Sequence, residues 1–182
     1  MSDKSAYYHG TIPPNAFLPK TGQTTSYVDY DDGWYEAGSP ASPRFVDNGD
    51  GTISDRATGL MWVKNPATVS GVGFDFSSGY VWFSVGTFPA LDAITAMNTA
   101  GYLGHSDWRL PNVKELHSIL DYGASGPSID PVFSVAVELY YWSSTTRNGG
   151  SSDAWAVDFY DGYVNALSKN GSYSIRPVRG GI

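Results

Sequence analysis

Apolar residues recur at helical spacing in two stretches of the chain. In the first, residues 88–97, every third position is apolar. This spacing predicts a helix that begins at Thr87 or Pro89 and ends at Gly101, because proline suits the first turn of a helix and glycine its end. Its expected buried stripe consists of Phe88, Leu91, Ile94 and Met97.

The second helical stretch carries a clear start signal. Asn112 is followed three residues later by Glu115, which is the spacing of a capping box. We therefore expect a helix that begins after Asn112 and ends near Gly123. Its expected buried stripe consists of Val113, Leu116, Ile119 and Leu120.

The remaining apolar segments have the pattern of strands. Residues 45–53 surround an "NGDG" sequence, which predicts a β-hairpin, and residues 60–64 follow it as a further strand. The C-terminal part contains hairpin turns at Asp161-Gly162 and Asn170-Gly171. These turns separate the last three of four expected strands, at 140–145, 154–160, 163–168 and 172–179.

This order of elements predicts an α+β domain with two helices packed on a small twisted antiparallel sheet. The domain is expected to span residues 44–182. Residues 1–43 are rich in proline, contain the acidic cluster Asp29, Asp31 and Asp32, and show no regular period. They are expected to form an extended N-terminal arm.

Composition narrows the classes of function. The chain has 182 residues, with 11 Lys and Arg against 18 Asp and Glu, a net charge of -7 and no cysteine. The acidic balance argues against nucleic acid as a partner, and the missing thiol excludes disulfides and cysteine nucleophiles. The longest uncharged apolar stretch, residues 76–91, is too short and too interrupted to insert into a membrane.

The sequence contains no recognisable catalytic or metal-binding motif. The histidines, His9, His105 and His117, lack the spacing of zinc ligands, and we expect no catalytic residue, no metal site and no cofactor. The stretch "DNGDGTISD" at 47–55 resembles a calcium loop, but Gly49 and Gly51 stand where an EF-hand needs oxygen ligands. A plain hairpin turn is favoured, with calcium kept as the alternative to test.

The six tryptophans have two interpretations, carbohydrate stacking and core packing. Apolar surroundings favour core packing for most of them, while Trp34 and Trp82 are left as candidates for exposed positions. The expected core comprises Trp62, Trp108, Leu116, Ile119, Trp142, Trp155, Val157, Phe159 and Ile175.

Residues 146–173 are the most informative segment for function. Tyr, Ser, Gly, Asn and Asp make up 17 of these 28 residues, a composition typical of antibody paratopes. Strand alternation places Trp155 toward the core and its neighbours on the displayed face, although an ordinary half-solvated sheet would show the same pattern. The expected ligand-binding residues are Arg147, Asn148, Ser151, Asp153, Ala156, Asp158, Tyr160, Tyr163, Asn170 and Tyr173.

Six separated motifs together resemble the Lcl C-terminal domain family. They occur in order between residues 19 and 179: "PKTGQTTSY", "RFVDNGDGTISDRATGLMWVK", "GHSDWRLPNVKEL", "YYWSSTT", "AWAVDF" and "YSIRPVR". The resemblance implies a C-type-lectin-like fold. It also implies similarity to the variable proteins of diversity-generating retroelements, in which codons near the C-terminus are rewritten while the scaffold is kept.

The favoured interpretation is therefore a non-enzymatic ligand-binding module, displayed on a virion or cell surface and directed at a protein or glycan of a host or neighbouring cell. One alternative is a calcium-dependent glycan-binding lectin or adhesin domain. Another is an enzyme related to formylglycine-generating enzymes, against which the absence of cysteine counts. The acidic charge argues against sulfated polysaccharide as the ligand.

Overall fold

The computed structural model describes residues 18–39, 41–65, 79–82, 89–124, 126–134 and 140–180. This part of the chain forms three antiparallel sheets and a few short helices, with runs of strands before α2 and after α3, so the expected α+β class is confirmed. The elements are α1 Asp32–Tyr35, β1 Phe45–Asp47, β2 Thr52–Asp55, β3 Leu60–Val63, β4 Tyr80–Val81, α2 Ala90–Ala100, the 3-10 helix η3 Tyr102–Gly104, α3 Val113–Ser118, β5 Tyr140–Thr146, β6 Asp153–Asp158, β7 Val164–Ser168, β8 Ser172–Tyr173 and β9 Val178–Gly180.

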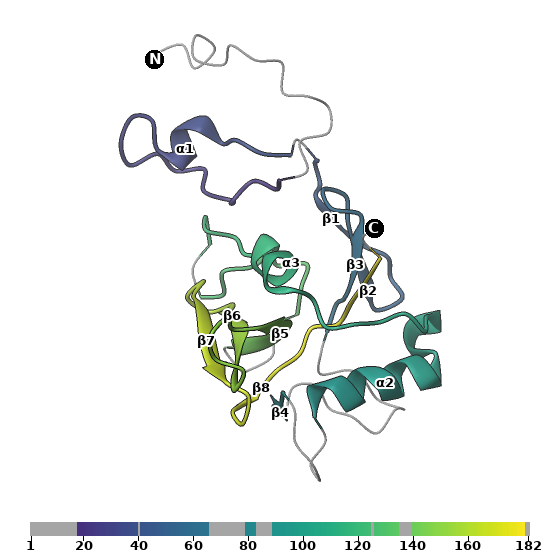
Figure 1. Cartoon of the computed structure of the whole chain (residues 1–182). Helices are drawn as coiled ribbons and strands as arrows, with labels where there is room; N and C mark the ends of the chain where they lie inside the picture. The colour runs from purple at the N-terminus through teal and green to yellow at the C-terminus, as the bar shows by residue number, and fades with distance from the viewer. Residues whose placement is uncertain are drawn as a thin grey trace.

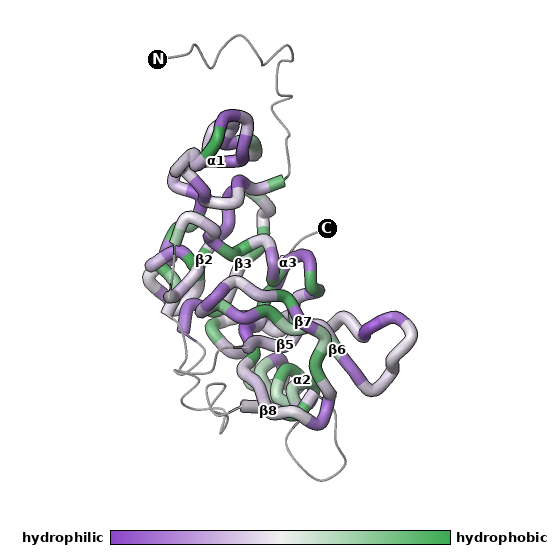
Figure 2. Tube along the Cα trace, turned by 90° about the vertical axis from the view of Figure 1, so that its left-hand side faces the viewer, coloured by the Kyte–Doolittle hydropathy of each residue, from purple (hydrophilic) through white to green (hydrophobic). Residues whose placement is uncertain are grey.

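The strands divide into sheets with the orders β1-β2-β3-β9, β4-β8 and β5-β6-β7. In Figure 1, α3 lies against one side of the β5-β6-β7 sheet, and β4 and β8 lie toward the other. The apolar residues of β5 and β6 belong to two clusters, one shared with α2 and one shared with α3. Figure 2 shows the hydrophobic segments of β5, β6 and α2 close together and mainly hydrophilic connecting loops.

Helix α2 ends where the sequence predicts. Gly101 follows it with a left-handed backbone, φ 60°, and donates its N–H to the carbonyl oxygens of Asn98 and Met97, an arrangement that favours glycine. The expected stripe is partly wrong, because Leu91 is exposed. The expected start at Thr87 and the stripe residue Phe88 lie outside the described residues. The side chains that α2 buries are Ala90, Ala93, Ile94 and Met97.

Helix α3 has the predicted capping box. The Asn112 side chain accepts hydrogen bonds from the N–H groups of Lys114 and Glu115, and the Glu115 carboxylate accepts one from the Asn112 N–H. The helix ends at Ser118 rather than near Gly123. It ends early because the chain turns to form a β-bridge between Leu120 and Ile129.

The predicted facing of β6 is wrong. Ala154 and Ala156 are fully buried in the cluster shared with α2, whereas Trp155 is only half-buried. Val157 is also fully buried, on the opposite side of the strand, in the cluster shared with α3. Because both faces of the strand are covered, alternation between large and small residues does not separate core from surface here. All the other residues of the predicted core are buried.

The N-terminal segment is not simply extended. Trp34 in α1, one of the two candidates for an exposed position, is buried, and its backbone N–H donates a hydrogen bond to the carboxylate of the N-cap residue Asp31. The second uncertain tryptophan, Trp82, is half-buried. The segment contacts the domain through a hydrogen bond from the Tyr122 N–H to the Thr21 carbonyl oxygen. In Figure 1, α1 lies apart from the β5-β6-β7 sheet.

The expected strand at 172–179 is split into β8 and β9. Between them, Arg176 is fully buried, and its guanidinium donates hydrogen bonds to the carbonyl oxygens of Val63, Lys64 and Ser134. No carboxylate pairs with Arg176 among the described residues. Desolvation lowers the pKa of Arg176 below its ordinary value. The arginine therefore ties three segments of backbone together in the interior.

Candidate ligand-binding surface

Asp158 forms hydrogen bonds with the backbone of the turn between β6 and β7. This residue is 3% exposed, so its predicted display to a ligand is wrong. Its carboxylate accepts a hydrogen bond from the Tyr160 N–H at 2.7 Å, and its own N–H donates to the Tyr163 carbonyl oxygen at 2.8 Å. Gly162 takes a left-handed backbone with φ 79° at the tip of this turn. Asp158 thus fixes the backbone of the turn without being part of its surface.

Two tyrosines project from this turn. Tyr160 is 52% exposed and Tyr163 is 60% exposed, as expected for displayed residues. A third tyrosine, Tyr122, is 48% exposed and comes from the segment after α3. Gly162 lies against the Tyr122 ring, since a Cβ at Gly162 would be 3.5 Å from its Cε1 atom. We call Tyr122, Tyr160 and Tyr163 the tyrosine surface.

The segment 126–128 supports the tyrosine surface from the side. The Ser128 hydroxyl donates to the Tyr160 carbonyl oxygen at 3.1 Å, and the Ser128 N–H donates to the Phe159 carbonyl oxygen at 2.7 Å. Gly126 lies under the Tyr160 ring, where a Cβ would come within 3.3 Å of Cζ. These contacts join two segments more than thirty residues apart and hold the turn rigid.

His117 extends the tyrosine surface. Its Nε2 atom and the Tyr122 hydroxyl are hydrogen-bonded at 2.8 Å, and the two rings meet edge to face. Desolvation raises the pKa of Tyr122 above its ordinary value, so the hydroxyl stays protonated at neutral pH. The sequence analysis missed both residues as surface partners, because nothing in the local sequence indicates that Tyr122 meets the Asp161-Gly162 turn.

Five of the other predicted ligand residues lie at the opposite end of the β5-β6-β7 sheet: Arg147, Asn148, Ser151, Asp153 and Asn170. The loop 147–152 joins β5 to β6, and the loop 169–171 follows β7, so both lie away from the 159–163 turn. The Lys169 N–H donates to the Ser152 carbonyl oxygen at 2.8 Å, which holds these two loops together. Among the predicted residues at this end, the exposed ones are Arg147, Asn148, Ser151 and Asn170.

Several side chains at this second end are engaged within the protein. Arg147 forms a 3.0 Å ion pair with Asp153, which is half-buried. Lys169 Nζ lies 4.0 Å from the centre of the Trp82 ring and donates to the Thr146 hydroxyl at 2.9 Å. These contacts order the loops and leave the backbone of the second end well defined.

Two of the ten predicted positions besides Asp158 have packing roles. Ala156 is fully buried beside Trp142 and Asn165 in the register of the sheet, so its predicted display is wrong. Tyr173 is half-buried, with its ring 4.9 Å from that of Trp142 and 5.6 Å from that of Tyr140. The ten residues therefore form no single surface. Ala156 and Asp158 lie in the interior, Tyr173 packs against Tyr140 and Trp142, and the other seven are divided between the two ends of the sheet.

The described residues offer no cluster of three or more His, Asp or Glu side chains that could hold a metal ion. In the hairpin considered for calcium, Asp47 forms a 2.5 Å ion pair with Lys64, and Asp50 accepts hydrogen bonds from Thr52. The Lys64 ammonium holds the pKa of Asp47 below its ordinary value. The next carboxylate, Asp55, is paired with Arg44. The carboxylates of the hairpin are thus already engaged.

The two histidines within the described part of the chain each contact an aromatic ring. His105 meets the Trp108 ring edge to face, His117 is bonded to Tyr122, and His9 lies outside the described residues. In the same described ranges, none of the helices is both long enough and apolar enough to cross a membrane.

The comparison with family models agrees with the motifs that lie within residues 51–179, whereas the first motif, at residues 19–27, lies outside the match. A comparison with curated proteins found no match. The family model described as the Lcl C-terminal domain matches residues 51–179, from the hairpin turn after β1 to the β9 strand. This span includes the tyrosine surface, both ends of the β5-β6-β7 sheet and most of the core. The chain therefore belongs to the Lcl C-terminal domain family.

Proposed function

We propose that the protein is a non-enzymatic ligand-binding module that recognises a protein or glycan on a cell surface through the tyrosine surface. The observation that carries the proposal is the exposure of Tyr122, Tyr160 and Tyr163 beside a turn that is held by hydrogen bonds with Asp158 and Ser128. Exposed tyrosines on a fixed backbone supply large contact areas at a low cost in conformational entropy. Such residues dominate the binding energy of many interfaces.

The proposal includes a C-type-lectin-like fold and a diversified C-terminal segment. Two helices against a small antiparallel sheet support the first part. The second part is supported by exposed loop positions at both ends of the sheet, where side chains can change without disturbing the core. If the segment is diversified, variation is expected at exposed positions such as Asn148 and Tyr163 and not at the buried Ala156 and Asp158.

The gene neighbourhood tests the diversification directly. A reverse transcriptase gene beside an imperfect repeat of the 3′ coding end is expected. The repeat should differ from the coding sequence at codons of the exposed loop residues. A repeat whose differences fall on the codons of Ala156 or Asp158, both buried, would contradict the proposed role of the surface.

Ligand binding is tested with the full chain applied to a glycan array and to an array of cell-surface protein ectodomains, with and without calcium. For any saturable hit, Tyr160→Ala and Tyr163→Ala are expected to weaken binding by about thirtyfold each, the effect of an aromatic anchor worth about 2 kcal/mol. The matched control is Tyr27→Ala, since Tyr27 is 83% exposed and lies in the N-terminal segment. Equal binding by all three variants would refute the proposed surface.

A further inference from the structure

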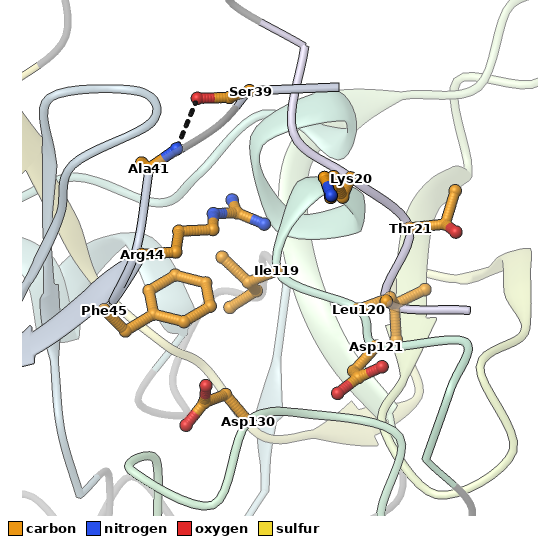
Figure 3. Close-up of a pocket in the computed structure, with 11 residues that line it drawn as sticks. Lys20, Thr21, Ser39, Ala41, Arg44, Phe45, Ile119, Leu120, Asp121 and Asp130 are labelled. Atoms are coloured by element: carbon orange, nitrogen blue, oxygen red, sulfur yellow. Dashed lines mark hydrogen bonds between the residues drawn. The ribbon is translucent and has the colours of Figure 1, made fainter. Parts of the chain in front are cut away.

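A small pocket lies between the N-terminal segment and the domain, separate from the tyrosine surface. It encloses about 190 Å³ and is lined by residues of the 20–22 segment, β1 and the chain after α3. Figure 3 shows Phe45, Ile119 and Leu120 on its wall, with the carboxylates of Asp121 and Asp130 beside them. Sites for drug-sized ligands usually measure about 300–1,000 Å³, so this pocket suits a smaller group.

The two cations of the pocket are already neutralised. Arg44 donates from Nε and Nη2 to the Asp55 carboxylate at 3.0 and 2.7 Å, and from Nη1 to the Ser118 carbonyl oxygen at 2.8 Å. Lys20 Nζ lies 3.5 Å from Glu36 Oε2 in a partly exposed pair. Each cation of the pocket therefore has a carboxylate partner that does not line the pocket.

The two acidic side chains of the pocket have no such partner. Asp121 accepts a hydrogen bond from the Gly123 N–H at 2.8 Å, and Asp130 accepts one from the Val132 N–H at 2.8 Å. Among the described residues neither carboxylate forms an ion pair. Each is half-buried, so its charge is only partly hydrated. The pocket thus carries two negative charges without a cationic partner among the described residues, beside an apolar wall.

From this imbalance we infer that the pocket binds an alkyl ammonium group, with the ammonium between Asp121 and Asp130 and the alkyl chain against Phe45, Ile119 and Leu120. An aliphatic stem on an apolar wall gains from burial, and an ammonium bonded to carboxylates forms the stronger, charge-assisted class of hydrogen bond. A lysine side chain and a free primary amine share this chemistry. The net charge of -7 favours a cationic ligand over an anionic one.

The test uses three probes with four carbon atoms each: n-butylamine, whose protonated form has the same carbon chain and ammonium group as a lysine side chain, n-butanol and butyrate. Each is titrated into the full chain and followed by amide chemical shifts. Saturable binding of n-butylamine is expected in the millimolar range typical of so small a ligand. The amides of Gly22 and Gly123 should shift, because both glycines lie against the Asp121 carboxylate. Butanol and butyrate should bind at least tenfold more weakly.

Two isosteric variants remove one charge each. Asp121→Asn and Asp130→Asn keep an oxygen acceptor for the N–H groups of Gly123 and Val132, so the local backbone should be preserved, and each should weaken n-butylamine binding at least tenfold. The matched control is Asp92→Asn, which removes the same charge from an exposed position on α2 and should leave binding unchanged. Tyr160→Ala should also leave it unchanged, which separates this site from the tyrosine surface.

The blocked amino acid Nα-acetyl-lysine N-methylamide distinguishes the two sources of the ammonium group, because its side chain carries its only ammonium. Binding as tight as that of n-butylamine supports a peptide lysine as the ligand, and binding of n-butylamine alone supports a small amine. Binding of butanol or butyrate as tight as that of n-butylamine would overturn the inference. So would equal weakening by Asp92→Asn and Asp130→Asn, or the absence of shifts at Gly22 and Gly123.

Discussion

Replacing Ala156 by leucine tests the corrected facing of β6. Ala156 is fully buried in the cluster shared with α2, next to Trp142 in the register of the sheet. Three additional carbon atoms have no free space in such a site. Overpacking of a dense core costs about 1–3 kcal/mol. We therefore expect Ala156→Leu to lower the free energy of unfolding by that amount.

The control for this substitution is its neighbour across the strand pair. Asn165 lies opposite Ala156 on the same face of the sheet, but it is exposed because β7 is an edge strand. Asn165→Leu should change the free energy of unfolding by no more than about 0.5 kcal/mol. The two substitutions introduce the same side chain, so their difference measures the packing around Ala156.

Urea denaturation followed by tryptophan fluorescence gives both free energies of unfolding. In thermal unfolding, the expected loss for Ala156→Leu corresponds to a decrease of about 2–12 °C in Tm for a protein of this size. The reasoning fails if Ala156→Leu is as stable as Asn165→Leu. Ala156 would then face solvent, and the predicted display of this position would be restored.

Three further predictions concern the scaffold. Asn112→Ala should destabilise the protein by about 0.5–2 kcal/mol through loss of the α3 cap, measured by urea denaturation, whereas Asn112→Asp should retain most of the stability. Arg176→Lys should cost about 1–3 kcal/mol because an ammonium cannot reach all three carbonyl oxygens and leaves at least one unsatisfied; Tm measurements check this. The pKa of Asp47 is lower in the folded protein than its ordinary value of 3.8. The ionised carboxylate therefore stabilises the protein above pH 3.8, and this stabilisation is lost as the pH falls through the pKa of the folded state. The Asp47→Asn variant should lack this loss when Tm is measured as a function of pH in the acid range.

Local signals in the sequence predicted the start of α3 and the end of α2. The start of α3 depends on Asn112 and Glu115, and the end of α2 depends on Gly101. Each signal acts within one turn of helix, so the sequence contains all the information needed. The Asp161-Gly162 turn is a signal of the same kind, because its backbone conformation depends on Gly162 itself.

The facing of β6 could not be predicted in this way. Alternation identifies one buried face only when the other face meets water. In this protein the small residues Ala154 and Ala156 lie in the cluster shared with α2, while Val157 lies in the cluster shared with α3. In the sequence, small side chains on a covered face have the same alternating pattern as side chains on a solvent-exposed face. Only the tertiary arrangement distinguishes a covered face from an exposed one.

Only two of the three residues of the tyrosine surface were predicted, for a similar reason. Tyr160 and Tyr163 flank a turn that the sequence indicates, but Tyr122 reaches them only because Ser128 and its neighbours pair with the 159–160 backbone. That pairing joins segments distant in sequence, and no local pattern records it. The pocket between the N-terminal segment and the domain was missed on the same grounds.

The burial of Asp158 strengthens the case for display at its neighbours. A surface that tolerates changes of side chain needs a backbone that does not depend on those side chains. At this turn the backbone is fixed by the Asp158 carboxylate, by the conformation of Gly162 and by the Ser128 hydroxyl. None of these three groups belongs to Tyr160 or Tyr163. The two tyrosines can therefore be exchanged for other residues while the turn keeps its shape, which is the division of roles that a variable ligand-binding surface requires.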